Sequence, residues 1–277
     1  MREVALAGFD HVDLTDSWLR PGDLSPDRLE DLVRALKDNG LGVTAISSIR
    51  KSVIDPDPEV SAGNLAYTLR NVDAAAQIGT AVLSVGLHRP LTPAQQAARW
   101  FWTEQGESDP VGDDRTWALA VERLRAVGSY AAKAGINISL EMYEDTYLGT
   151  ADSAVALVTD IDLPNVGLNP DIGNLIRLHR PIENWEDMHL KTMPHANYWH
   201  IKNYFRDYDP ATGAYFSSPA PAESGYINYR RALEIALESG FSAPLCVEHY
   251  GGDGLSVSAS NRDYLRRILA VKLSVPR

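Results

Sequence analysis

The chain has a single cysteine in 277 residues, Cys246, which excludes an intramolecular disulfide and a cysteine-based zinc cluster. It also has no apolar run approaching the roughly 20 residues that a membrane-spanning helix needs. The opening stretch MREVALAGF lacks the apolar segment of a secretory signal peptide. We therefore expect a cytoplasmic protein without a membrane partner.

Positive charge is also scarce, with 26 Lys and Arg against 37 Asp and Glu and a formal net charge of −11. Nucleic acids and anionic membranes are bound by clustered Lys and Arg that neutralise phosphates. The charge balance therefore predicts no nucleic-acid partner. Hydrophobic residues make up 44% of the chain, and no linker or shift in composition divides it. We expect a single domain over residues 1–277.

Short apolar runs alternate with segments of helical spacing from one end of the chain to the other. The runs are HVDL (11–14), VTAIS (43–47), AVLSVG (81–86), NISLEM (137–142), VGLNP (166–170), WHIKN (199–203) and LCVEH (245–249). Such alternation indicates a parallel sheet built from βαβ units. Neighbouring strands start about 30 residues apart where no loop intervenes, close to the repeat of a (β/α)₈ barrel. The predicted fold is an α/β TIM barrel.

Three of the intervening segments have the apolar stripe of a helix and end at a glycine. They are residues 25–40, where Ser25 or Asp27 can cap the helix, residues 117–135 and residues 227–240. Two further segments exceed the barrel repeat, namely residues 89–112 and residues 203–227, which is rich in Pro, Gly, Ser and aromatics. We predict long loops there, over the active-site face, because functional residues concentrate on such loops.

The predicted strands number seven, whereas a closed barrel has eight. The opening REVALAGFDHVDL has the pattern of a helix end that runs into a strand. The first strand and most of its helix are therefore expected to be absent. A truncated sequence or a mis-assigned start would explain this, and so would a barrel that is incomplete by nature or closed by another element.

Four of the predicted strands finish in a polar side chain that packing alone does not require. These residues are Glu141, Asp171, His200 and Glu248, separated by 30, 29 and 48 positions. The C-terminal ends of barrel strands converge on one mouth. Three carboxylates there would repel one another and protonate unless a cation neutralised them. Three oxygens and one imidazole suit Mn²⁺, Mg²⁺, Co²⁺ or Zn²⁺, so we predict one divalent metal ion, with Mn²⁺ preferred.

Each of these residues also has a structural interpretation when it is taken singly. A glutamate at a strand end can pair with an arginine, His200 can be a core histidine with satisfied ring nitrogens, and Asp171 can cap a turn. The occurrence of all four at the ends of the last strands favours the metal site.

The motifs around these residues resemble the sugar isomerase/epimerase family with a xylose-isomerase-like TIM barrel. Its members include inosose isomerases, inosose dehydratases, hydroxypyruvate isomerases and ketose 3-epimerases. The resemblance is loose in the N-terminal half and clear from about residue 120 onward. It is carried by SLEMYED, NPDIGN, WHIKNYFRD, GYINYRRALEIALESGF and CVEHYGGD.

The resemblance implies specific roles for residues of this chain. The metal ligands would be Glu141, Asp171, His200 and Glu248, with Glu141 and Glu248 also serving as the catalytic acid/base pair. Arg206, six positions after the metal histidine, matches an arginine of the ketose epimerases. The chain departs from those epimerases three positions after the metal aspartate, where it has Asn174 in place of a histidine, and FWTEQGESDP (101–110) has no counterpart.

Other residues near the same mouth are candidates for contacts to the substrate. Besides Arg206 and Asn174, they are Lys202 and His88, which follows the strand at 81–86. The alternative for Lys202 is a solvated residue at a strand end. The aromatic residues 100–102 either form an apolar wall over a sugar ring or pack in the interior.

A metal ion held by carboxylates polarises a carbonyl and makes the adjacent C–H acidic, so that a carboxylate can remove its proton. Return of the proton to the opposite face gives epimerisation, and return to the neighbouring carbon gives isomerisation. We predict a divalent-metal-dependent isomerase or epimerase that acts on a small keto sugar, keto-polyol or inosose. A lyase or dehydratase that acts on an inosose or a 3-keto-glycoside is the alternative, because a leaving group next to the carbanion gives elimination.

Two further alternatives are less consistent with the sequence. Apurinic-site endonucleases share the barrel but need a three-zinc cluster with more histidines and a basic face, against seven histidines and a net charge of −11 here. A metal-free binding or subunit protein is the other. The expected partner is a small carbohydrate, and a homo-oligomer is an expectation from the family alone.

Overall fold

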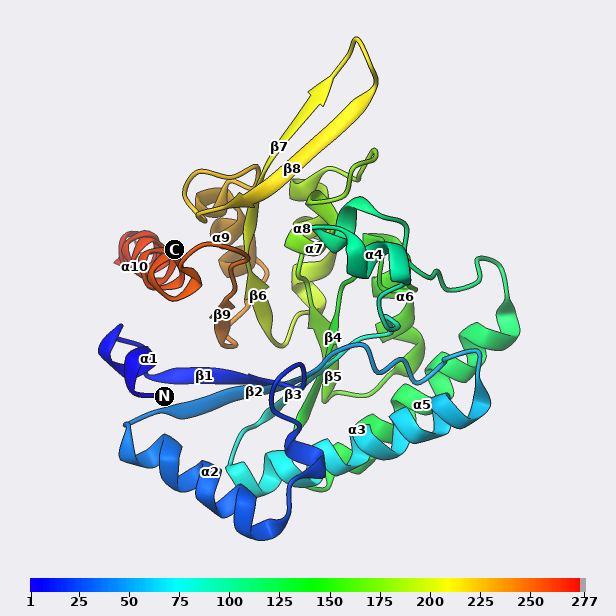
Figure 1. Ribbon diagram of the computed structural model, residues 1–277, viewed down its shortest axis with the longest axis vertical. Helices are drawn as coiled ribbons and strands as arrows, with labels where there is room; N and C mark the ends of the chain where they lie inside the picture. Colours follow the sequence, from blue (N-terminus) through cyan, green and yellow to red (C-terminus); the bar gives the residue numbers. More distant parts are fainter. Residues whose placement is uncertain (275–277) are drawn as a thin grey trace.

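The computed structural model describes residues 1–274, in which strands and helices alternate along the chain (Figure 1). The strands are β1 His11–Thr15, β2 Gly42–Ser48, β3 Val82–Val85, β4 Asn137–Glu141, β5 Val166–Asn169, β6 Trp199–Ile201, β7 Asn203–Asp209, β8 Ala214–Ala220 and β9 Leu245–Val247. The α-helices are α1 Arg2–Leu6, α2 Pro26–Asp38, α3 Pro58–Ile78, α4 Pro93–Ala97, α5 Asp114–Ala132, α6 Ala151–Ile161, α7 Gly173–Ile176, α8 Trp185–Thr192, α9 Tyr229–Glu238 and α10 Gly254–Ser274. Short 3₁₀ turns lie at Pro21–Asp23, Phe101–Thr103 and Met193–His195.

All seven predicted strands are present, and all of them pair in parallel. Strands β1 to β5 form one sheet in sequence order, and β6 pairs with β9. An isolated parallel bridge between Leu168 and Ala196 links the end of β5 to the segment before β6. Helices α2, α3 and α5 lie along the outer side of the five-stranded sheet (Figure 1). The expected α/β barrel architecture is confirmed.

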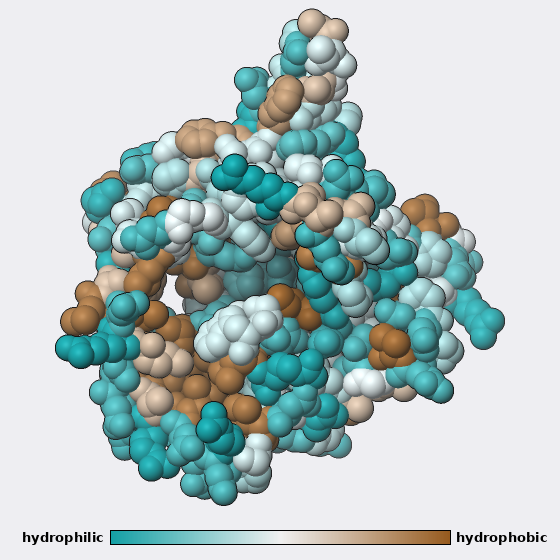
Figure 2. All heavy atoms as spheres, viewed as in Figure 1, coloured by the Kyte–Doolittle hydropathy of each residue, from teal (hydrophilic) through white to brown (hydrophobic). Residues whose placement is uncertain are grey.

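Strands β1 and β9 each have one hydrogen-bonded neighbour, and no strand within residues 1–274 pairs with their other edge. Helix α10 reaches across this part of the molecule, where Arg262 donates to the carbonyl of Ala7 at 2.7 Å and Arg266 pairs with Asp10 at 3.1 Å. The surface is hollowed between these elements (Figure 2). The barrel is therefore open between β1 and β9.

The predicted helix ends are found with small shifts. Ser25 caps α2 by accepting from the backbone N–H of Arg28, and Asn228 caps α9 in the same way. Gly40, Gly135 and Gly240 follow their helices with φ of +67°, +69° and +80°, which explains the glycine at each position. None of the helices within residues 1–274 is long and apolar enough to cross a membrane.

The prediction of a long loop over residues 203–227 is wrong for most of that segment. Strands β7 and β8 form an antiparallel hairpin that projects from the body of the molecule (Figure 1). The facing pair Tyr208 and Tyr215, whose ring centroids are 4.7 Å apart, stabilises the hairpin. Gly213, at φ +73°, closes the turn. The other predicted loop, residues 89–112, contains only α4 and one 3₁₀ turn.

Candidate metal centre and active site

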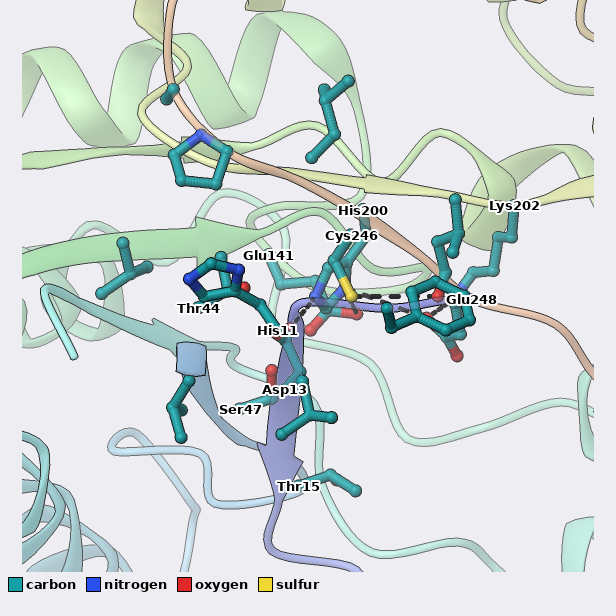
Figure 3. Close-up of a pocket in the computed structure, with 18 of the residues that line it drawn as sticks. His11, Asp13, Thr15, Thr44, Ser47, Glu141, His200, Lys202, Cys246 and Glu248 are labelled. Atoms are coloured by element: carbon teal, nitrogen blue, oxygen red, sulfur yellow. Dashed lines mark hydrogen bonds and ion pairs between the residues drawn. The ribbon is translucent and has the colours of Figure 1, made fainter. Parts of the chain in front are cut away.

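The four residues predicted at strand ends lie together in the structure, and Figure 3 shows three of them, Glu141, His200 and Glu248. Glu141 is the last residue of β4, Asp171 follows β5, His200 lies in β6 and Glu248 follows β9. Atom Nδ1 of His200 is 4.0 Å from Glu141 Oε1, 3.6 Å from Asp171 Oδ2 and 3.8 Å from Glu248 Oε2. These separations are too long for hydrogen bonds, but they suit ligands that each lie about 2 Å from one shared ion.

The polar atoms that face this point are buried and poorly satisfied. Neither Asp171 oxygen nor His200 Nδ1 makes a hydrogen bond of acceptable geometry within the described residues. The Asp171 side chain is fully buried, and that of His200 is 8% exposed. Burying several carboxylates at one point is costly unless positive charge balances them, and Lys202 supplies a single charge there. Three oxygen donors and one imidazole around a single point therefore fit a divalent cation.

Lys202 provides positive charge inside this cluster. Its Nζ atom lies 2.8 Å from Asp171 Oδ2 and 2.8 Å from Glu248 Oε2, and the side chain is 3% exposed. Although burial opposes it, the two carboxylates raise the pKa of Lys202 well above its ordinary value. Gly173 makes room for the stem, because a Cβ atom there would lie 2.3 Å from Lys202 Cγ. Lys202, which the sequence predicted as a substrate contact, is thus also a counter-ion of Asp171 and Glu248.

The protonation of the cluster depends on burial and on these neighbours. Burial raises the pKa of Glu141 above its ordinary value. Burial also acts on Asp171, but Lys202 and His200 outweigh it and lower the pKa of that carboxyl. His200 lies among carboxylates that outweigh the effect of burial and raise its pKa well above the ordinary value. Without a metal ion, the cluster therefore relies on protons and the ammonium group for charge balance.

Asn174, another predicted substrate residue, contacts a candidate ligand directly. Its Nδ2 atom donates to Glu141 Oε1 at 3.1 Å and to the carbonyl of Met142 at 2.9 Å. The amide is 1% exposed and lines the cavity beside the cluster. In this structure Asn174 fixes the orientation of the Glu141 carboxylate.

His88 lies in the wall of the same cavity. Its ring stacks on Tyr143 with centroids 4.1 Å apart, and the Tyr143 hydroxyl accepts a hydrogen bond from Arg50 at 2.8 Å. Burial lowers the pKa of His88 well below its ordinary value, with Arg50 and other cations acting in the same direction. His88 is therefore neutral, and a neutral imidazole can both donate and accept a hydrogen bond.

The structure does not bring Arg206 together with the other candidates. Its guanidinium donates to the backbone carbonyls of Ile176, Leu178 and Arg180 and stacks over the ring of Tyr215 at 4.7 Å. These bonds attach β7 to the segment that follows α7. Arg206 is not among the residues that line the cavity.

Sequence reasoning missed two groups at the site. Asp13 in β1 accepts hydrogen bonds from Tyr198 and, at 3.2 Å, from His200 Nε2. The signal was an acidic residue that interrupts an apolar strand, the same signal that identified Glu141. The second group is the buried pair Arg177–Glu144, with the Arg177 guanidinium 4.8 Å from the centroid of Phe101 and 5.2 Å from that of Trp102. The aromatic loop therefore packs on a buried cation.

A cavity of about 1190 Å³ connects these residues. Its inner part is lined by His88, Glu141, Tyr143, Asn174, His200, Lys202, Glu248 and Tyr250. From there it extends along the free edge of β1 to α10, where its lining is largely apolar. A monosaccharide-sized ligand fits beside the cluster with room to spare.

The chain matches a known protein family and a solved structure of high sequence identity. A family model described as "Xylose isomerase-like TIM barrel" matches residues 1–268. A crystal structure of a xylose isomerase-like TIM barrel protein from Mycobacterium smegmatis in complex with magnesium is 47% identical, with a TM-score of 0.93. The match covers 99% of this chain and 88% of that chain. The comparison with curated proteins gives no match.

More distant solved structures share the fold. D-psicose 3-epimerase with D-tagatose from Clostridium cellulolyticum H10 is 16% identical with a TM-score of 0.71, over 96% of this chain and 91% of that one. The IOLI protein with a bound zinc atom is 15% identical with a TM-score of 0.72, over 99% and 93% of the two chains.

Proposed function

Because the chain belongs to the xylose isomerase-like TIM barrel family, we propose that it is a divalent-metal-dependent isomerase or epimerase. Its substrate would be a small keto sugar, keto-polyol or inosose. The observation that carries the proposal is the convergence of Glu141, Asp171 and Glu248 around His200 Nδ1, at 3.6 to 4.0 Å. Similarity to a magnesium complex and to a sugar epimerase supports the same assignment.

When bound, the metal ion would polarise the carbonyl of the substrate and thereby acidify the adjacent C–H. Glu141 and Glu248 are the proposed proton-transfer pair. Glu141 is buried and held by Asn174, so its carboxylate has a fixed direction. The Glu248 side chain is 33% exposed and faces the open cavity, where a substrate enters. One glutamate would remove the proton and the other would return it, which gives epimerisation when they act on opposite faces.

The remaining groups would bind and orient the sugar. Lys202 has three N–H donors and uses two carboxylates as partners, so it can donate to a substrate oxygen. His88 lines the cavity and stays neutral, which suits a hydroxyl contact. Tyr143 and Tyr250 would supply apolar faces against which the sugar ring packs.

The donor set leaves the metal's identity to be measured. Three carboxylates and one imidazole without a thiolate suit Mn²⁺, Mg²⁺ or Co²⁺, and Zn²⁺ also accepts such ligands. We propose Mn²⁺ as the preferred ion. The structures of relatives contain magnesium in one case and zinc in another.

A lyase or dehydratase is the second candidate. Its supporting observation is the cavity of about 1190 Å³, above the roughly 300–1000 Å³ of common small-molecule sites. A 3-keto-glycoside would use that volume, and a leaving group next to the acidified carbon would turn proton removal into elimination. Product analysis separates the two reactions.

The test begins with metal content and proton exchange on the same preparation. We expect about one divalent ion per chain by elemental analysis, and solvent deuterium incorporated into a keto sugar or inosose from a screen. Glu248→Gln should lose most of the exchange, because general acid–base groups contribute about 10²- to 10⁴-fold. Glu238→Gln, on the exposed side of α9, is the matched control. If the folded protein takes up no metal on dialysis, the proposal is wrong.

A further inference from the structure

We propose that Asp13 is a positioning residue that orients His200 for metal binding. By accepting a hydrogen bond from Nε2–H (Figure 3), it would leave the Nδ1 lone pair facing Glu141, Asp171 and Glu248. The inference rests on the proposed metal-dependent function and adds a residue to it that supplies no metal ligand.

The two nitrogens of the His200 ring face different partners. Nε2 lies 3.2 Å from Asp13 Oδ2, which as a carboxylate oxygen can only accept. A metal-bound imidazole is neutral and has one N–H and one lone pair, so an N–H held at Nε2 by Asp13 places the lone pair at Nδ1. Nδ1 has no hydrogen-bond partner within the described residues and faces Glu141, Asp171 and Glu248. The hydrogen bond therefore selects the tautomer that a metal ligand needs.

Asp13 is itself held in place by a second donor. The hydroxyl of Tyr198 donates to the same Oδ2 atom, and the Tyr198 side chain is fully buried. The Tyr198 ring also packs edge-to-face on His200, with centroids 5.2 Å apart. Tyr198 and His200 both lie on the same stretch of chain and both meet Asp13 across the barrel interior. The carboxylate can therefore rotate little without losing one of its two bonds.

A different assignment, with Asp13 as a metal ligand, is less consistent with the geometry. Ligand atoms of Asp13, His200 and Cys246 also lie within 4.8 Å of one another. A neutral imidazole offers one lone pair, so His200 cannot serve this set and the strand-end carboxylates together. Asp13 Oδ2 already accepts from two donors, whereas His200 Nδ1 has no hydrogen-bond partner within the described residues. Asp13 is therefore assigned outside the metal's own ligands.

Removal of a group that hydrogen-bonds to a metal-bound histidine typically costs 10- to 100-fold in metal affinity. Asp13→Asn keeps the size of the side chain, but it removes the charge and replaces a group that can only accept by one that can also donate. We expect a 10- to 100-fold weaker affinity for Mn²⁺ and Zn²⁺, measured by competition with a chelator on metal-stripped protein. Asp10→Asn, an exposed carboxylate three residues earlier, should leave the affinity unchanged.

Two further measurements can contradict the proposal. Cys246→Ser should bind metal as the unsubstituted protein does, and a loss as large as that of Asp13→Asn would identify the Asp13–His200–Cys246 set as the binding site. Nitrogen NMR of histidine in the zinc-loaded protein needs no variant, and it should show a proton on His200 Nε2. A proton on Nδ1 would overturn the proposal.

The outcomes separate this inference from the proposed function. If the unsubstituted protein binds no metal, both are wrong. If it binds metal and Asp13→Asn binds it within twofold, only the role of Asp13 is overturned. Melting temperatures of the metal-free proteins are compared in parallel, so that a general loss of folding is not mistaken for a local effect.

Discussion

Arg177 and Glu144 form a buried ion pair in which one guanidinium nitrogen donates to both carboxylate oxygens at 3.0 Å. Neither side chain is more than 5% exposed. Around the guanidinium lie the rings of Phe101, Trp102, Tyr143 and Tyr250. This pair connects the chain after β4 to the aromatic residues of the loop over residues 89–112.

Removal of one partner of this pair should be strongly destabilising. Glu144→Gln leaves the Arg177 charge buried without a counter-charge, so we expect a loss of about 3–5 kcal/mol in the free energy of unfolding. Urea titration measures it. The exposed pair Lys191–Asp152 is the matched control, and Asp152→Asn should cost less than about 1 kcal/mol. Similar losses in the two variants would mean that the buried pair contributes no more than a surface one.

Lys202 should compete with the metal ion for the same carboxylates. Because its ammonium lies 2.8 Å from oxygens of both Asp171 and Glu248, a divalent cation must bind beside an existing positive charge. Lys202→Met should therefore raise metal affinity by about tenfold or more, since nearby like charges repel strongly in a partly buried site. Chelator competition measures it, with turnover expected to fall if Lys202 contacts the substrate. Weaker metal binding in the variant would instead show that Lys202 organises the carboxylates.

Asp109 should make the stability of the loop over residues 89–112 depend on pH. Its carboxyl is buried, accepts a hydrogen bond from the Tyr147 N–H at 2.9 Å, and has a pKa that burial raises from 3.8 to about 6. A raised pKa in the folded state means that stability is fully present below about pH 4 and is lost as the pH rises through 6.

Replacement of Asp109 by Asn keeps an acceptor for Tyr147 and removes the titrating group. We expect Asp109→Asn to exceed the unsubstituted protein in free energy of unfolding by at most about 3 kcal/mol at pH 8, and to match it near pH 4. Denaturant titrations at the two pH values measure the difference. A constant difference between the two proteins at both pH values would contradict the assignment.

Arg206 should act on stability rather than on substrate affinity. Because its guanidinium satisfies three backbone carbonyls, Arg206→Met should lower the free energy of unfolding by about 1–3 kcal/mol. The Michaelis constant of any active variant should change little. A large rise in that constant at unchanged stability would support the direct substrate contact that the family resemblance implies.

The strands and the residues at their ends were predictable because both depend on local pattern. Parallel strands bring their C-terminal ends to one edge, so the positions of Glu141, Asp171, His200 and Glu248 follow from where the apolar runs stop. Asp13 carries the same kind of signal, but its partner, His200, is 187 residues away and becomes visible only when β1 faces β6 across the interior.

The hairpin and Arg206 show where local pattern is insufficient. Gly, Pro and Ser in residues 203–227 suggested a loop, whereas the strands β7 and β8 pair over seven positions, with Tyr208 packed against Tyr215 across them. Arg206 lies at the spacing expected from the family, yet nearby backbone carbonyls offer it three acceptors. The choice of partner depends on tertiary contacts that spacing alone does not encode.

Because β1 has a free edge, local opening of its backbone should affect the orientation of His200. Within residues 1–274, strand β1 pairs with a strand on one side only, so its amides should open more readily than those of β3 or β4. Asp13 lies in that strand, and each opening of β1 would release His200 from its hydrogen bond. Occupancy of the metal centre should accordingly slow amide hydrogen exchange along β1, a strand that contributes none of the four ligands.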